Sequence, residues 1–120
     1  MTRVLQLKNI KTGTIEECFD DSALKSNENF EFMKIGSTYD CKIELFGNFV
    51  EKETPSSVSI NIEEELFIGK KMMIRVKLDN EFYYIPKKNE KDISVNAIMN
   101  FEFTRKDLIQ VEDVIHGDYI

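Results

Sequence analysis

The chain has 120 residues, of which 16 are basic and 22 acidic, and its net charge is -6. This length is ordinary for one domain, so we expect a single domain over residues 1–120. A negative net charge repels phosphate backbones at long range, which disfavours general nucleic-acid binding. Hydrophobic residues make up 42% of the chain, which is enough to build a core without disulfides or metal.

The two cysteines, Cys18 and Cys41, are too few for the disulfide framework of a small secreted domain, and their spacing matches no zinc motif. We expect reduced, buried thiols, because free cysteine is among the most buried residue types. The first residues lack the apolar run of a signal peptide, and no stretch approaches the ~20 apolar residues of a membrane span. We therefore expect a cytoplasmic protein without membrane association.

Short β-forming runs separated by turn residues dominate the first hundred positions, where helical periodicity is weak. Residues 4–10 and 14–19 flank Lys11-Thr12-Gly13, which suits a three-residue hairpin loop with glycine in the left-handed conformation. The polar residues 20–29 predict a loop or one helical turn.

Residues 39–45 alternate between apolar and polar side chains, which is the clearest strand pattern in the chain. The pattern continues past Gly47, so we expect a bulge or sharp bend there. The alternative is a hairpin turn at Gly47-Asn48. Residues 54–57 predict a loop, and residues 58–62 predict another strand with one apolar face.

A second hairpin is predicted over residues 71–78 and 81–85, because Asp79-Asn80 tolerates the positive φ of a two-residue turn. Pro86 should end its second strand. Residues 87–92 are charged and predict a flexible connection.

The C-terminal quarter begins with an apolar stripe at residues 97–103. The following residues 105–116 fit two structures. Thr104 and Asp107 resemble a helix N-terminal cap, whereas the many β-branched residues favour a strand. We favour the strand.

These elements predict an all-β fold, with one short helix as the alternative for the last stretch. Six or seven short antiparallel strands in a chain of this size must close into a barrel or stack as two sheets to cover their apolar faces and edges. Over residues 32–103 the order of a long bent strand, a short strand and a hairpin resembles the oligonucleotide/oligosaccharide-binding (OB) barrel. We expect a small antiparallel β-barrel, OB-like or SH3-like, with an added N-terminal hairpin.

Catalytic and metal-binding patterns are weak. The single histidine, His116, lies near the C-terminus, where we expect a solvated tail rather than a metal site. The carboxylate runs Asp20-Asp21 and Glu63-Glu64-Glu65 alternate between faces in a strand, so we assign them to solubility and to protection of strand ends. No nucleophile or phosphate-loop motif occurs. We expect no enzymatic activity, no cofactor and no metal.

The hairpin over residues 71–85 carries the most informative surface. In its first strand, residues 71–78, the even-numbered side chains should face one side of the sheet and the odd-numbered side chains the other. The odd-numbered face carries a basic stripe of Lys71, Arg75 and Lys77, and Tyr83 or Tyr84 should lie beside this stripe. Cations and rings together suit a protein partner or single-stranded nucleic acid. In the alternative interpretation the tyrosines fill the core and the cations pair with nearby glutamates. The candidate binding residues are Lys71, Met73, Arg75, Lys77, Tyr83 and Tyr84.

The leading hypothesis is a non-enzymatic module that binds another protein through a barrel face or an exposed edge strand. The alternative is an OB-like protein that binds single-stranded nucleic acid, which the net charge disfavours. An enzyme whose carboxylates or Cys41 converge only in the folded chain is a weaker third hypothesis. Exposed strand edges also make a homodimer an option.

Overall fold

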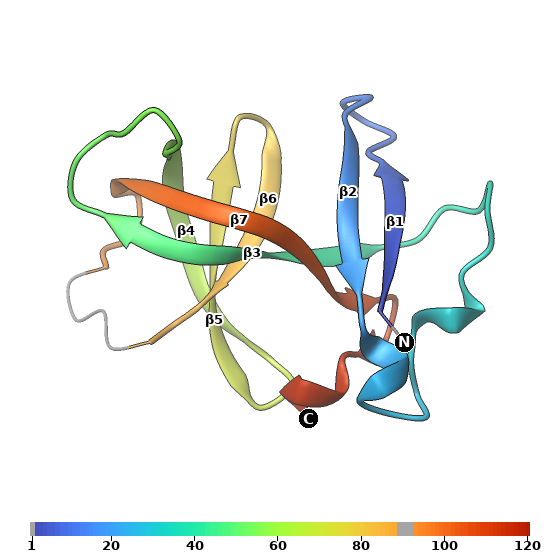
Figure 1. Ribbon diagram of the computed structural model, residues 1–120. Helices are drawn as coiled ribbons and strands as arrows, with labels where there is room; N and C mark the ends of the chain where they lie inside the picture. The colour runs from blue at the N-terminus through green and yellow to red at the C-terminus, as the bar shows by residue number, and fades with distance from the viewer. Residues whose placement is uncertain (1, 89–92) are drawn as a thin grey trace.

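The computed structural model describes residues 2–88 and 93–120, and within them the chain forms strands and short 3-10 turns but no α-helix (Figure 1). The all-β prediction is therefore confirmed. The strands are β1 (Arg3–Lys8), β2 (Ile15–Asp20), β3 (Cys41–Val50), β4 (Val58–Ile68), β5 (Lys71–Leu78), β6 (Glu81–Pro86), β7 (Ile98–Val111) and β8 (Val114–Ile115). The 3-10 turns are η1 (Ser22–Leu24), η2 (Phe30–Phe32) and η3 (Gly117–Tyr119).

Both predicted hairpins form. The first loop has four residues, 10–13, between the bonded residues Asn9 and Thr14, so the predicted three-residue loop is one residue too short. β1 pairs with β2, and Gly13 between them has a φ of 77°. β5 pairs with β6, and Asp79 in their turn has a φ of 56°. The polar segment after β2 contains the η1 turn, as predicted. Of the predicted flexible connection, residues 89–92 lie outside the described residues.

Five strands pair in a ring. β7 pairs with both β3 and β4, β4 and β6 each pair with β5, and β6 meets β3 through the single parallel pair Glu44 and Tyr84. The expectation of a purely antiparallel arrangement is wrong for a simple reason. Directions cannot alternate around a closed ring with an odd number of strands, so one contact must be parallel. The β1–β2 hairpin joins this ring through a second parallel pair, Phe19 and Asp107 (Figure 1).

The structure has a bulge in the pairing of β3 with β7 at Gly47, which confirms the predicted irregularity, and the hairpin-turn alternative is wrong. The register of β3 and β7 shifts between Phe46 and Gly47, and Thr104 is the extra residue on β7. β7 passes so close that a Cβ atom on Gly47 would overlap the carbonyl oxygen of Glu102. Glycine is therefore required at this close approach of the two backbones.

β4 is longer than predicted because it continues through the glutamate run. Its register with β5 shifts between Ile62 and Glu64, which leaves Glu63 as a bulged residue. A one-residue insertion exchanges the two faces of a strand. Ile62 accordingly packs on one side of the sheet. Leu66 and Ile68 lie two and three pairs of residues further along the same strand, yet they pack on the opposite side.

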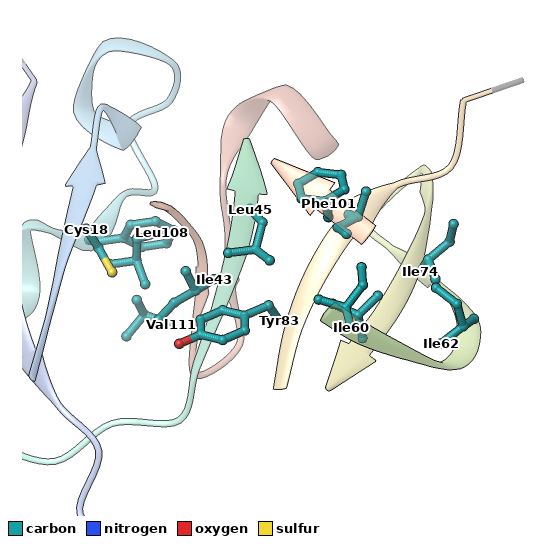
Figure 2. Packing of buried hydrophobic residues seen from close by; sticks show 13 residues of the cluster. Cys18, Ile43, Leu45, Ile60, Ile62, Ile74, Tyr83, Phe101, Leu108 and Val111 are labelled. Atoms are coloured by element: carbon teal, nitrogen blue, oxygen red, sulfur yellow. The ribbon is translucent and has the colours of Figure 1, made fainter. Parts of the chain in front are cut away.

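The apolar side chains form two clusters, one on each side of the sheet. The main core extends from the β1–β2 hairpin to β4 (Figure 2). Its buried members are Cys18, Phe30, Ile43, Leu45, Ile60, Ile62, Ile74, Val76, Tyr83, Ile85, Phe101, Leu108 and Val111. The second cluster contains the buried residues Ile68, Met73, Tyr84, Ile109 and Tyr119.

The last stretch forms strands, so the helical alternative for residues 105–116 is wrong. β7 runs on to Val111, and β8 turns back to pair with it. The segment then ends in η3, where Tyr119 completes the second cluster. No helix that could cross a membrane occurs in the part of the chain that the structure describes.

Both cysteines are free, as expected. Cys18 is fully buried in the main core, and Cys41 is half-buried. Burial raises the pKa of the Cys18 thiol to about 12 and that of Cys41 to about 11. Both side chains therefore stay protonated at neutral pH, which leaves little nucleophilic thiolate.

Candidate interaction face

The β5–β6 hairpin presents cations and an aromatic ring on its outer face. The register places Arg75 opposite Tyr84 and Lys77 opposite Phe82, so these four side chains share one face. The core residues Ile74 and Val76 alternate with them on the other face. The predicted assignment of the two faces of β5 is therefore right.

Phe82 is the exposed ring of this face. Its side chain is 49% exposed. The Arg75 Cζ atom lies 4.9 Å from the centroid of the Phe82 ring, and the Lys77 Nζ atom lies 5.9 Å from it. Cations at these distances are attracted to the face of a ring. We call Arg75, Lys77 and Phe82 the cationic face.

Arg75 also contacts a carboxylate within the chain. Its Nη2 atom donates to Glu64 Oε2 at 3.0 Å, while its buried Nε atom has no hydrogen-bond partner among the described residues. On the adjacent residue, Glu65 pairs with Lys87 at 2.6 Å. The interpretation that glutamates pair with cations of this hairpin is therefore right for these two pairs.

Three of the predicted binding residues are not on the surface. Met73 is completely buried, and Tyr83 and Tyr84 are 2% and 8% exposed. The expectation of an exposed stripe that includes Met73 and a tyrosine is thus wrong. The side chains of Met73 and Tyr84 do point outward from the ring of strands, but Tyr119 packs over them. Tyr83 points into the main core instead.

Lys71, the remaining predicted residue, is exposed at the start of β5. Its Nζ atom lies 4.6 Å from the centroid of the Tyr119 ring. Lys71 therefore covers the edge of the second cluster and stands apart from the Phe82 ring. Of the six candidates, only Lys71, Arg75 and Lys77 offer charged groups to a partner.

Sequence reasoning missed Phe82. Its signal was present, because Phe82 precedes Tyr84 by two residues and must share its face in a strand. The two-residue turn at Asp79-Asn80 also fixes Phe82 directly opposite Lys77.

A buried polar network fastens the β1–β2 hairpin to the ring. The Tyr83 hydroxyl donates to Glu16 and also lies 2.7 Å from Glu81 Oε2. Lys106 Nζ donates to Glu16 Oε1 at 2.5 Å. Burial and the two carboxylates raise the pKa of Tyr83. Each charged group of the network contacts an oppositely charged group or a hydrogen-bond donor. The network is therefore suited to holding the β1–β2 hairpin in place.

A second network lies on the outer side of β3 and β7. Glu44 and Asp107 are paired residues of these strands, and the Tyr119 hydroxyl donates to Glu44. Burial raises the pKa of Glu44, and the neighbouring Asp107 adds to the rise. Burial also raises the pKa of Asp107, although Arg105 opposes this. The pair resembles an acid–base site in composition, but Tyr119 covers it.

The C-terminal segment is docked, so the prediction of a solvated tail at His116 is wrong. His116 is 4% exposed, and its Nε2 atom lies 2.5 Å from Asp21 Oδ1. Its Nδ1 atom accepts a hydrogen bond from the backbone of Asp118 at 3.1 Å. The segment could not be placed from local sequence because several of its partners, such as Asp21 and Glu44, are distant in the sequence.

The Asp20-Asp21 run is structural rather than a solvated strand end, which corrects the expectation. Asp20 is 2% exposed and pairs with Arg3 at 2.6 Å. Burial alone would raise the pKa of Asp20, but hydrogen bonds from Ser22 and the contact with Arg3 hold it below its usual value. Asp21 contacts His116, as described above.

A small cavity of about 80 Å³ lies where β3 and β6 diverge beyond their single bridge. Its walls include Glu44, Phe46, Asn48, Ile85 and Phe101. The volume suffices for only a few water molecules, which is far smaller than typical sites for organic ligands. Over residues 2–88 and 93–120, no group of three or more His, Cys, Asp or Glu side chains could hold a metal ion.

The chain was compared with known proteins at three levels. No family model, no curated protein and no solved structure matches it. Any function must therefore be argued from the geometry of the chain itself.

Proposed function

We propose that this protein is a non-enzymatic interaction module, which binds an acidic segment of another protein through the cationic face. The observation that carries the proposal is the half-exposed ring of Phe82 beside Arg75 and Lys77. Aromatic residues and arginine are enriched in the residues that dominate binding energy at protein interfaces. Positive charge on this face of an otherwise acidic chain favours an acidic partner.

The architecture that we propose for the module is a small barrel of the OB-like or SH3-like kind. The ring of β3, β6, β5, β4 and β7 supports closure. The strand order has one distinguishing feature: β3 and β4 are consecutive in sequence, yet they do not pair with each other, and both pair with β7.

Single-stranded nucleic acid is the alternative partner. Such platforms combine a basic groove with successive rings on which bases stack. On the hairpin face only one ring, that of Phe82, is exposed, since Tyr84 is buried. The net charge of -6 also opposes phosphate binding. These observations favour a protein partner.

The test uses two labelled probes, a random copolymer of glutamate and tyrosine and an oligothymidine of about 20 nucleotides, with binding followed by fluorescence anisotropy at several salt concentrations. We expect the copolymer to bind, and the Arg75→Gln/Lys77→Gln variant to lose at least about tenfold in affinity. Lys8→Gln/Lys11→Gln removes the same charge from the β1–β2 hairpin and should retain binding.

The outcomes separate the hypotheses. Failure of the copolymer to bind, or equal losses in both double variants, would overturn the proposal. Binding of the oligonucleotide that weakens linearly on a log-log salt plot and is lost in Arg75→Gln/Lys77→Gln would establish the nucleic-acid alternative.

A further inference from the structure

We infer that Glu64 is an internal competitor for Arg75, and that a carboxylate of the partner replaces it when the cationic face is occupied. The inference rests on the proposed function and adds two things to it. It identifies Arg75 as the anchor that selects an acidic side chain, and it identifies the group that keeps this anchor occupied in the free protein.

The bulge in β4 is what places Glu64 beside Arg75. Ile62 faces the main core, so an unbroken strand would direct Glu64 to the core as well. The bulged Glu63 reverses this, and Glu64 becomes the paired neighbour of Arg75 on the outer face. A carboxylate is thus held against a cation that Phe82 already positions from the other side.

The contact between Glu64 and Arg75 is easily exchanged. The side chains are 49% and 34% exposed, so water screens their attraction. Only one hydrogen bond, from Nη2, joins them, while Nε has no partner among the described residues. A carboxylate that accepts two hydrogen bonds from a guanidinium group makes a shorter and stronger contact. An incoming carboxylate with that geometry would bind Arg75 more strongly than Glu64 does.

The adjacent pair of Glu65 and Lys87 supplies a matched control. It has a comparable exposure, 37% and 35%, and a shorter distance of 2.6 Å. Glu65 is paired with Ile74 of β5, whose side chain faces the main core, whereas Glu64 is paired with Arg75. Removing either carboxylate changes the net charge equally, but only Glu64→Gln frees Arg75.

The experiment measures copolymer affinity for the wild type, Glu64→Gln and Glu65→Gln. Since an exposed ion pair contributes little, we expect Glu64→Gln to bind about two- to fivefold more tightly than Glu65→Gln. In the Arg75→Gln background the effect of Glu64→Gln should disappear, because there is no longer a cation to free. Thermal unfolding of each variant confirms that the fold is kept.

Several results would overturn the inference. Equal tightening in both single variants would indicate a general charge effect, and an unchanged or weaker affinity of Glu64→Gln would show that Glu64 does not compete. A Glu64→Gln effect on the oligothymidine alone would assign the anion to phosphate instead of carboxylate. If no variant binds the copolymer, the proposed function itself fails, which is distinguishable from a wild type that binds without responding to Glu64.

Discussion

Two buried tyrosines of this protein make the same bond in opposite electrostatic surroundings. Tyr83 donates to Glu16 on the core side of the sheet, and Tyr119 donates to Glu44 on the outer side. The consecutive residues Lys106 and Asp107 of β7 decide the difference. Lys106 pairs with Glu16, whereas Asp107 lies across from Glu44. One network is neutralised by a cation, and the other brings two carboxylates together.

The contrast shows how strand alternation can build two different sites from adjacent residues. In the first network, Glu16 pairs with Lys106 at 2.5 Å. In the second, burial and the neighbouring carboxyl group favour the protonated form of Glu44. We therefore expect the two networks to differ in how strongly substitutions and pH change the stability of the protein.

The largest effect should follow from Lys106→Met. It leaves the buried carboxylate of Glu16 without its cation, and breaking such a pair typically costs about 3 kcal/mol or more. Urea unfolding at pH 7 measures the loss. Adding Glu16→Gln should restore part of it, because the stranded charge is removed. A loss below about 1 kcal/mol in the single variant would show that Glu16 does not depend on Lys106.

Tyr83→Phe and Tyr119→Phe compare the two hydroxyl groups directly. Each should cost about 1–3 kcal/mol of unfolding free energy, because a buried carboxylate loses a donor. We expect Tyr83→Phe to cost more, since both Glu16 and Glu81 lose their contact with it. Glu44, whose pKa is already raised, can take up a proton instead. The cost of Tyr119→Phe should accordingly shrink between pH 7 and pH 5, and a constant difference would contradict this account.

Glu44→Gln should have the smallest effect, in the stabilising direction at neutral pH, because burial and Asp107 disfavour the charged form of Glu44. The pKa of Glu44 is raised in the folded state, so the folded protein holds this proton more tightly than the unfolded chain. This contribution is complete below the ordinary carboxyl pKa and is lost as pH rises through the raised value. Glu44→Gln should remove that decline in a series of urea unfolding curves over pH. A variant that is destabilised at pH 7 would show that ionised Glu44 is favourable where it lies.

Local chemistry was enough to predict part of the fold. Gly13 and the turn at Asp79-Asn80 specify their hairpins through the backbone conformations that they permit. Gly47 marks the bulge because a side chain there has no room. At these positions the structure depends on residues that are close in sequence, or on a space that only glycine can fill.

Features that depend on distant segments were not predictable in the same way. Met73 has the position of a surface residue in its own strand, and it is buried because the second cluster, which includes Tyr119, packs around it. The bulge at Glu63 has no distinct signature, because a run of glutamates suits either face. The candidate site was therefore predicted in part, with Arg75, Lys77 and Lys71 found correctly on the surface and Phe82 overlooked.

The position of β7 in the ring also constrains the order of assembly during synthesis. β3 pairs mainly with β7, and β4 has β5 on one side and β7 on the other. Cys41 of β3 pairs with Val111 near the end of β7. Until β7 has been made, these two strands can form no ring and expose unpaired edges that invite aggregation. The β5–β6 hairpin and its cationic face can form earlier, because their contacts are local. In a nascent chain the proposed binding surface would thus be present before the ring of strands has closed.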